Sequence, residues 1–339
     1  MTVSNVINNK PNVRPQTRAR VLAAIEATGY QVNPLARALA GGRARLLSVL
    51  TRQQNLPYAT EVLMGAAQAA EEYGYDLIVL MAGSGTASDL SPMASLSAGT
   101  LLIQPPPDVR ERFPHLPAHL VSVDGPSDWP LTVDNASGAR AATQHLISLG
   151  HTRIAFISGM DAHHRRLAGS AVPYGPPGVG EDAPQRLDAY RQTMRSAGLS
   201  VPDGYVQSGD YSKRSGEEAT HRLLALPDPP TAIFASGDAM AVGVMHTLQN
   251  LGLRVPEDLS VIGFDDLPMA AQARPALTTV RQPLREMGAE GVRLIVRLAE
   301  GEDPPAGPPA PFPTELIVRA STAPPLGSAD GAGAAGRQP

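Results

Sequence analysis

The side chains with the clearest chemical purpose in this sequence are the cations of its first 45 residues. Seven Lys and Arg side chains oppose one acid, Glu26, so this stretch carries about +6, whereas the whole chain carries −4. The cations are Lys10, Arg14, Arg18, Arg20, Arg37, Arg43 and Arg45. The other 294 residues therefore carry about −10. A basic head on an acidic body predicts that the head binds a polyanion and that the body has a separate function.

Short helices are expected to position these cations. Residues 2–9 have helical spacing with an apolar face of Val3, Val6 and Ile7,. Polar side chains on or near the other face could reach bases and phosphates, namely Thr2, Ser4, Asn5 and Asn8,. From these residues alone, a solvated two-helix extension is an equally good interpretation.

A second helix is predicted to start at Pro15 and stop at Gly29, with Val21, Leu22 and Ile25 on its apolar face,. A third, over residues 35–40, follows Asn33-Pro34 and ends at Gly41-Gly42. Six residues are too few for a stable isolated helix, so this segment needs a partner helix or DNA to form.

The body reads as an α/β protein. Apolar runs of strand length, at 46–50, 76–81, 100–103, 119–124, 154–157, 232–235 and 260–264, alternate with helical segments,. This alternation predicts parallel sheets with helices on both faces and a ligand site beyond the carboxyl ends of the strands. There is no cysteine, no secretory signal and no apolar run long enough to span a membrane, which favours the cytoplasm,.

The head resembles the LacI/GalR (lactose/galactose repressor) family of transcriptional regulators. Residues 2–8 match the family's recognition helix, residues 13–30 its third helix and residues 33–39 its hinge helix, in order and with their mutual spacing. The family has a further helix and turn before the recognition helix, so the head is expected to be truncated and poorly ordered. The resemblance implies DNA contacts by Thr2, Ser4, Asn5, Asn8, Asn12, Arg14, Thr17, Tyr30, Asn33, Ala36, Arg37, Leu39 and Ala40, with Leu39 wedged into the minor groove,.

The body resembles the same family through segments such as LGHTRIAFI (149–157), GLRVPEDLSVIGFDD (252–266) and PALTTVRQP (275–283). The resemblance implies two doubly wound parallel-sheet subdomains like those of periplasmic binding proteins, preceded by a truncated helix-turn-helix head and a hinge helix at about 33–41. The expected boundaries are 1–44 for the head, 45–133 plus 284–311 for the first subdomain, and 134–283 plus 312–324 for the second. Residues 325–339 are expected to be a disordered tail.

The resemblance also assigns an effector cleft between the subdomains. The residues carried over are Arg52 and Tyr58, both in the loop after the first strand, together with Asp124, Arg186, Tyr211, Asp265 and Gln282. Together they supply donors, acceptors and an aromatic face, which suits a sugar or nucleoside. Each has a plain alternative: the acids could cap loop amides, the arginines could pair with neighbouring acids, and the tyrosines could simply pack. Gly237 stands where many members carry an amide or hydroxyl.

Three segments fall outside the resemblance or the cleft. Residues 168–184 form a Gly/Pro-rich insertion with no family counterpart, expected to be a lid or disordered,. His163 to Arg166 (HHRR) suggests a metal or anion site, but a solvated charged loop is the better interpretation. Trp129 is expected to pack in a surface loop flanked by prolines.

The function predicted is therefore a cytoplasmic, homodimeric repressor that binds operator DNA and a sugar-like effector, with no cofactor, metal or membrane partner. The alternative is a cytoplasmic sugar- or nucleoside-binding protein whose truncated head binds DNA poorly. A transport protein is disfavoured by the missing signal peptide and the basic hinge. An enzyme is disfavoured because we find no G-x-S-x-G, P-loop or metal-spaced His/Cys motif,.

Overall fold

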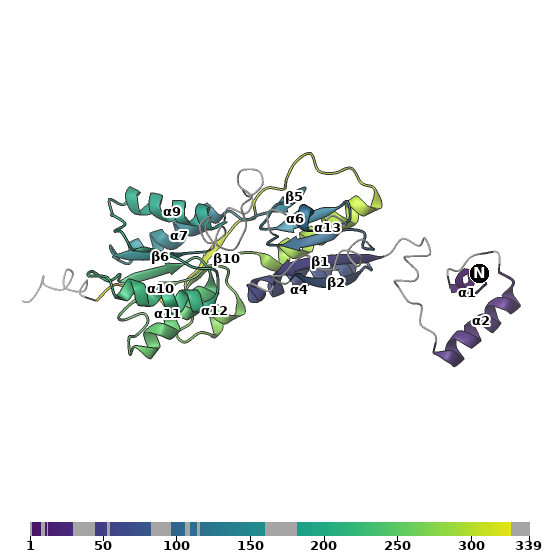
Figure 1. The fold of residues 1–339 in the computed structure, drawn as a ribbon, viewed down its shortest axis with the longest axis horizontal. Helices are drawn as coiled ribbons and strands as arrows, with labels where there is room; N and C mark the ends of the chain where they lie inside the picture. The colour runs from purple at the N-terminus through teal and green to yellow at the C-terminus, as the bar shows by residue number, and fades with distance from the viewer. Residues whose placement is uncertain are drawn as a thin grey trace, which may run out of the picture. The chain divides into compact units, whose positions relative to one another are not determined.

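The computed structural model describes residues 2–7, 11, 13–29, 45–52, 55–82, 96–105, 109–113, 116–159 and 182–326. The chain divides into two compact units, the head Met1–Ala44 and the body Arg45–Pro339 (Figure 1). The predicted hinge helix, the HHRR segment, most of the predicted insertion and residues 327–339 lie outside the described residues.

Two helices make up the described part of the head: α1 (Thr2–Ile7) and α2 (Pro15–Thr28). Pro15 occupies the first turn of α2, and Gly29 ends that helix in the left-handed conformation at φ 62°, as predicted,. Val6 is buried, at 3% exposure, and its carbonyl accepts a 3.4 Å hydrogen bond from Arg18. Of the predicted apolar face of α2, Val21 and Ile25 are half-buried and Leu22 is 51% exposed, and no residue of α2 is buried within the described head.

The first sheet of the body is parallel, in the order β2-β1-β3-β4-β5. Its strands are β1 (Leu46–Arg52), β2 (Asp76–Ala82), β3 (Thr100–Ile103), β4 (Leu120–Val123) and β5 (Trp129–Leu131). Alternate side chains of a strand enter opposite faces. Leu101 therefore packs with α4 (Leu56–Glu72) and α13 (Leu284–Glu300) on one face. Leu102 packs on the other face with Val109, the first residue of α6 (Val109–Arg112), and with Phe113, which follows that helix.

The second sheet is also parallel, in the order β7-β6-β8-β9. Its strands are β6 (Ile154–Ser158), β7 (Val206–Ser208), β8 (Ala232–Ala235) and β9 (Ser260–Ile262). Phe234 faces α7 (Asn135–Ser148) and α9 (Asp182–Ser196), while Ile233 faces α10 (Lys213–Leu224), α11 (Asp238–Asn250) and α12 (Pro268–Gln272). Both sheets are therefore covered on both faces, which confirms the predicted fold class.

A two-stranded antiparallel ladder joins the two halves of the body. It consists of β10 (Thr279–Arg281) and β11 (Glu315–Ile317), with Arg281 opposite Glu315. The chain enters β10 from the second sheet and leaves it for α13, which packs against α4 of the first. An isolated bridge between Asp265 and Arg281 places the chain just after β9 beside the carboxyl end of β10.

Most predicted strands and helices occur where expected, but three details differ. Trp129 is not in a loop: it begins β5 and packs, half-buried, against the first core. Tyr58 is in α4, not in the loop after β1. α9 begins at Asp182, so residues 182–184 of the predicted insertion are helical. Within the described residues, no helix is long and apolar enough to cross a membrane.

Candidate functional site

Polar residues with unusual backbone geometry follow the strands of both sheets. Asp124 comes directly after β4, Tyr211 lies shortly after β7 and Asp265 shortly after β9. Their φ angles are +50°, +66° and +116°. Residues other than glycine rarely adopt such φ angles, because each costs about 1–3 kcal/mol. Residues with this strained backbone cluster at functional sites. The carboxyl ends of parallel strands are also where α/β proteins bind ligands.

Arg186, in the first turns of α9, is the central cation of this region. Its Nε donates to Asn135 Oδ1 at 2.7 Å, and its Nη1 donates to the Ser236 carbonyl at 2.6 Å. The guanidinium lies 3.7 Å from the centroid of the Phe264 ring. Arginine has five N–H donors, so these two bonds leave several of them for a further partner.

Carboxylates surround this buried cation. Nη1 of Arg186 is 3.8 Å from Asp265 Oδ1, and both side chains are at most 5% exposed. Burial alone would lower the pKa of Arg186, but Tyr211, Asp265, Asp182 and Asp124 together raise that pKa above its ordinary value. Residues that follow strands of both sheets therefore act on one guanidinium.

Asp265 is a buried acid with a raised pKa. Burial raises the pKa of Asp265 to about 7, although Arg186 and the Gln282 side chain oppose that rise. Gln282 Nε2 donates to Asp265 Oδ1 at 2.6 Å. The other end of the amide, Gln282 Oε1, has no partner among the described residues, and neither have the buried hydroxyls of Ser158 and Ser236. Buried polar atoms without partners are costly, which indicates that something else pairs with them.

Two phenol–carboxylate pairs complete the site. Tyr58 donates its hydroxyl proton to Asp124, and Tyr211 donates its own to Asp182. Burial and the neighbouring acid raise the pKa of each phenol well above its ordinary value. Burial likewise raises the pKa of Asp124 to about 6. Both phenols thus keep their protons, and their oxygens keep lone pairs for a ligand hydroxyl.

The described side chains of this site are suited to hydrogen bonding with hydroxyl groups. Its described residues supply three carboxylates, two phenols, a guanidinium and an amide oxygen. Carboxylates accept hydrogen bonds from hydroxyls, and arginine donates to hydroxyl oxygens. A neutral molecule with several hydroxyls satisfies both, whereas an anion would meet three carboxylates.

Comparison with known proteins identifies the family. Residues 1–33 match the bacterial regulatory proteins of the lacI family, and residues 143–322 match the periplasmic binding protein-like domain. The chain is 35% identical over 310 residues to the ribose operon repressor of Escherichia coli (strain K12), covering 87% of this chain and 88% of that repressor. The chain belongs to the LacI family. It is a transcriptional regulator with a DNA-binding head and a ligand-responsive body.

Solved structures of LacI-family regulators have the same fold. A transcriptional regulator CelR–cellobiose complex superposes with a TM-score of 0.68 at 29% identity, covering 94% of both chains. The lac repressor dimer bound to operator and the anti-inducer ONPF superposes with a TM-score of 0.76 at 26% identity, covering 95% of this chain and 94% of that one. The periplasmic-binding-protein-like architecture predicted for this LacI-family regulator is therefore confirmed.

Six of the seven predicted effector residues converge in this LacI-family body: Tyr58, Asp124, Arg186, Tyr211, Asp265 and Gln282. Arg52 is the last residue of β1, but its side chain is not among those that the structure describes. In the head, Asn5 and Thr17 are half-buried and Arg14 is exposed. The side chains of Thr2 and Ser4, and the predicted DNA-contacting residues at 8, 12, 30, 33, 36, 37, 39 and 40, are not described.

Sequence reasoning missed Asp182, Asn135 and Phe264, which hold Tyr211 and Arg186 in place. It also left Gly237 unexplained. A Cβ at Gly237 would lie 3.0 Å from the Tyr211 ring, so the glycine makes room for this tyrosine. Gly159 does so more strictly, because a Cβ there would lie 1.9 Å from Tyr211 Cζ. A pair of glycines at strand ends is the signal that could have found this arrangement.

Gly159→Ala should therefore displace Tyr211 and break its bond to Asp182. We expect a loss of about 1–3 kcal/mol in the free energy of unfolding, the usual cost of overpacking. Urea unfolding measures it. Gly307→Ala is the matched control, since a Cβ at Gly307 meets nothing within 4 Å. Equal stability of the two variants would show that the Tyr211 ring is not confined.

The raised carboxyl pKa values predict how stability depends on pH. Asp124 and Asp265 bind protons more tightly in the folded body than at their ordinary pKa of 3.8. Their contribution to stability is therefore fully present below pH 3.8 and is lost as pH rises through about 6 for Asp124 and about 7 for Asp265,. His145 and His151 act in the opposite sense, because burial lowers their pKa values.

The double variant Asp124→Asn, Asp265→Asn separates these effects. Urea unfolding of the ligand-free protein at a series of pH values from about 4 to about 7.5 should show the parent losing stability relative to the variant as pH rises. The histidine contribution is common to both proteins and cancels in the difference. Parallel stability profiles would contradict the assignment.

Proposed function

We propose that the body binds a neutral, sugar-like effector at the site formed by Tyr58, Asp124, Arg186, Tyr211 and Asp265, and that this effector controls binding of the head to operator DNA. The observation that carries the proposal is a buried guanidinium among three carboxylates, beside buried oxygens of Gln282 and two serines. Among the described residues, the guanidinium has donors to spare and these oxygens have no partner. Ligand hydroxyls would satisfy these groups, whereas a phosphorylated sugar would be repelled by the carboxylates.

The relatives support a sugar over other neutral ligands. One is named as the ribose operon repressor, and one solved regulator is a cellobiose complex. The chain would thus act by binding rather than by catalysis, as a repressor of carbohydrate-utilisation genes. Because such a regulator works on chromosomal DNA, we place it in the cytoplasm.

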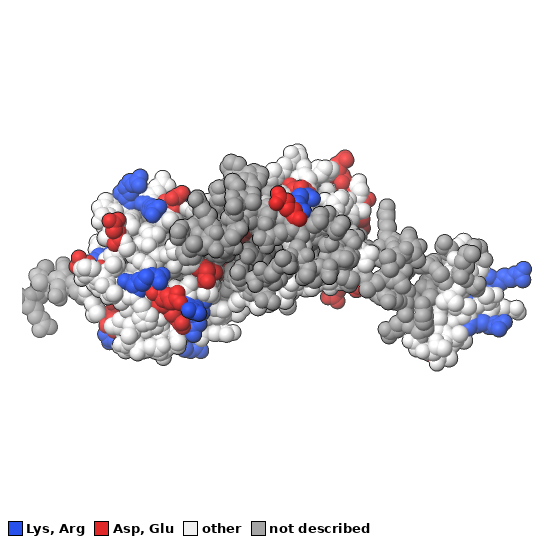
Figure 2. Space-filling view, viewed as in Figure 1, with Lys and Arg blue, Asp and Glu red and all other residues white. Residues whose placement is uncertain are grey.

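The head is proposed to bind operator DNA. Its described residues include Arg14, Arg18 and Arg20 against one acid, Glu26, and the charged side chains of the head visible in Figure 2 are basic. Cations of this kind bind phosphates with an affinity that falls steeply with salt. Sequence-selective contacts are assigned to the α1 segment and to the hinge around Leu39, as the family resemblance implies.

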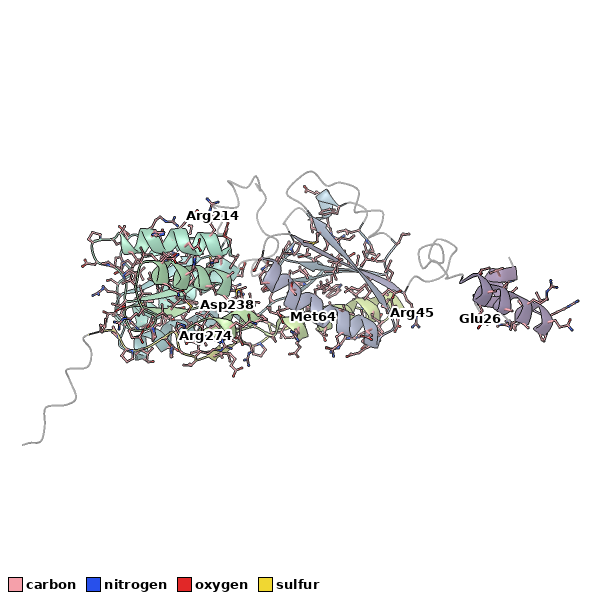
Figure 3. The ribbon with its side chains drawn as sticks, turned by 90° about the horizontal axis from the view of Figure 1, so that it is seen from below. Glu26, Arg45, Met64, Arg214, Asp238 and Arg274 are labelled. Carbon is pink, nitrogen blue, oxygen red and sulfur yellow. The ribbon has the colours of Figure 1, made fainter. Side chains whose placement is uncertain are left out.

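We further propose that the regulator is a homodimer. Leu56 and Met64, two turns apart on α4, are 44% and 52% exposed, and Met64 is labelled in Figure 3. Val79 and Met81 of the edge strand β2 are 41% and 43% exposed. α4 and β2 are in contact, and we propose that a second copy of the chain covers these exposed apolar side chains,. The lac repressor structure is itself a dimer. Two copies would present two heads to the half-sites of an operator.

The proposed subdomains keep the boundaries predicted from the sequence, 45–133 plus 284–311 and 134–283 plus 312–324. The packing of α13 against α4, and of β11 against β10, supports the assignment of these late segments. The site then lies between two subdomains of the body that the β10–β11 ladder connects, so that an effector can change the orientation of one subdomain relative to the other.

The experiment is a thermal-shift screen with D-ribose, cellobiose and other neutral sugars, with ribose 5-phosphate as the anionic comparison. A sugar present at about 100 times its Kd should add about 2.7 kcal/mol of stability. Electrophoretic mobility shift with duplex DNA, selected by the protein from a random pool, then shows whether the same sugar alters DNA binding. Stabilisation by the phosphate and by none of the neutral sugars would overturn the proposal.

A further inference from the structure

The short segment that carries Asp265 is held at each of its residues. The Asp265 N–H donates to the Val280 carbonyl at 2.7 Å, and the Leu267 N–H donates to Asp238 Oδ2 at 2.7 Å. Between them, Asp266 also has a positive φ of +56°, next to +116° at Asp265. Two consecutive residues in this conformation persist only where surrounding contacts enforce it.

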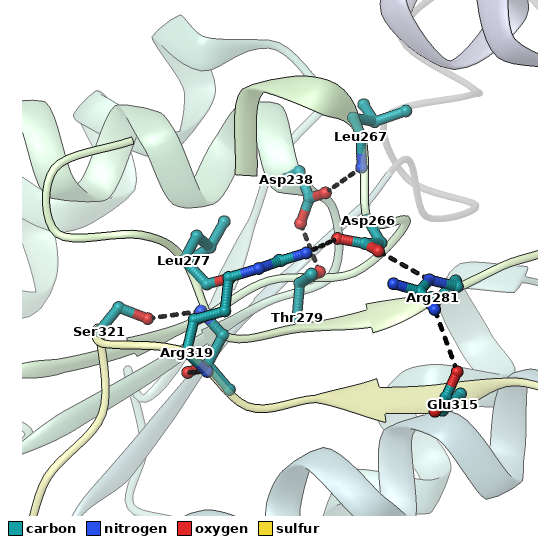
Figure 4. A network of polar contacts seen from close by, with 10 residues as sticks. Asp238, Asp266, Leu267, Leu277, Thr279, Arg281, Glu315, Arg319 and Ser321 are labelled. Carbon is teal, nitrogen blue, oxygen red and sulfur yellow. Dashed lines mark hydrogen bonds and ion pairs between the residues drawn. The ribbon is translucent and has the colours of Figure 1, made fainter. Parts of the chain in front are cut away.

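Two arginines, Arg281 and Arg319, hold the carboxylate of Asp266 and so stabilise its positive-φ backbone conformation (Figure 4). Arg319 Nη2 lies 2.6 Å from Asp266 Oδ1, and Arg281 Nε lies 2.8 Å from Asp266 Oδ2. Arg319 is itself fixed, since its Nη1 donates to the Leu277 carbonyl at 2.8 Å. Arg281 also pairs with Glu315 at 3.2 Å, across the β10–β11 ladder.

The Asp266–Arg281–Arg319 network adjoins the candidate site, because two of its residues are chain neighbours of site residues. Asp265 and Gln282 are bonded to each other in the candidate site, while Asp266 and Arg281, their immediate neighbours, are bonded to each other in the network. The Asp266 carboxylate is 8% exposed and the Arg319 side chain 19% exposed, so water screens their interaction little,. The network therefore fixes the backbone from which Asp265 and Gln282 project.

We propose that Arg319 is a positioning residue for effector binding: together with Arg281 it holds Asp266, and thereby keeps the Asp265 carboxylate against Gln282 and within reach of Arg186. Arg319 itself does not touch the effector. The proposal rests on the proposed function for its ligand, but it predicts a property of the ligand-free protein as well. The same network ties the site to the ladder that connects the two halves of the body.

The ligand-free test is hydrogen–deuterium exchange of the full chain. Arg319→Met should speed exchange at the Asp265 and Leu267 amides about tenfold or more, and leave exchange in the first sheet unchanged. Arg319→Lys keeps a cation beside Asp266 and should recover part of the protection. Arg254→Met, which removes an exposed ion pair with Asp258 on the second subdomain, should leave the 265–267 amides as in the parent. Parental exchange in Arg319→Met would overturn the proposal.

The binding test uses D-ribose and cellobiose as probes in isothermal titration calorimetry. For whichever sugar the parent binds, Arg319→Met should weaken affinity about tenfold, whereas in an Asp265→Asn background the same change should cost less than about twofold. A residue that merely supports the fold would weaken binding equally in both backgrounds, and that result would reject a positioning role. Failure of both sugars to bind the parent would exclude ribose and cellobiose as effectors, and the exchange measurement on the ligand-free protein would then decide the role of Arg319.

Discussion

The Arg186→Ala protein is expected to bind a sugar effector about 10- to 150-fold more weakly than the parent. A hydrogen bond made by a charged group contributes about 1.5–3 kcal/mol, and each 1.4 kcal/mol is about a factor of ten in affinity. The loss should reach this range because the guanidinium is already oriented by Asn135, Ser236 and Phe264, so a ligand that it binds need not order it,. Isothermal titration calorimetry with the sugar selected by the thermal-shift screen measures the change.

Two companion variants separate binding from folding. Arg195→Ala removes an exposed arginine from the same helix and should leave affinity and stability near those of the parent. Arg186→Lys keeps the charge but cannot make the two fixed bonds to Asn135 and Ser236, so its affinity should fall between those of the parent and Arg186→Ala,. Stability is also expected to fall in Arg186→Ala, since Asp265 loses its buried cation,. Unchanged sugar affinity in a folded Arg186→Ala protein would place the effector elsewhere.

The fold could be predicted because its signals are local. A buried parallel strand is apolar on both faces, so runs such as residues 154–157 and 232–235 stand out without knowledge of their partners,. Helix ends were equally local: Pro15 begins α2 and Gly29 ends it. The short strands β5, β7, β10 and β11 were missed because each has only three residues and none belongs to a longer apolar run, whereas β9, equally short, lies in the run 260–264.

The site could be predicted only in part, because its geometry depends on contacts between residues far apart in sequence. Strand-end residues such as Asp124 and Asp265 were assigned through the family pattern. Asp182 was not, since it lies within the Gly/Pro-rich segment 168–184 that was predicted to be an insertion, and it gains its role only when α9 brings it to Tyr211. The bond between Arg319 and Asp266 spans 53 residues, and no local pattern predicts it.

The head shows that an apolar pattern along a helix does not by itself determine burial. The spacing of Val21, Leu22 and Ile25 is that of an apolar helix face, yet Leu22 is 51% exposed and the other two are half-buried. Periodicity states which side chains share a face, but burial requires another element to cover that face. Within the described head, Val6 of α1 is the buried apolar residue, so the packing of this unit depends on it.

Val6→Asp should therefore abolish sequence-selective DNA binding and leave sugar binding intact. Replacing a 3%-exposed valine by a carboxylate loses its apolar burial and buries an unpaired charge, together roughly 3 kcal/mol or more,. A unit with so small a core cannot tolerate that loss. Operator affinity should fall to the non-specific level, about 10³-fold or more, and the residual binding should weaken steeply with salt. The body is a separate compact unit, so its affinity for sugar should not change.

Fluorescence anisotropy with duplex DNA selected by the parent, at one salt concentration, measures the loss of DNA affinity. Calorimetry on the same preparation measures the affinity for sugar. Ala23→Asp adds the same charge at an exposed position of α2 and isolates simple repulsion from the phosphates. That control should lose far less affinity, because it disturbs no packed residue. If Val6→Asp kept parental selectivity, the folded α1–α2 pair would not be what reads the operator. If sugar affinity fell along with DNA affinity, the substitution would have disturbed the body as well as the packing of the head.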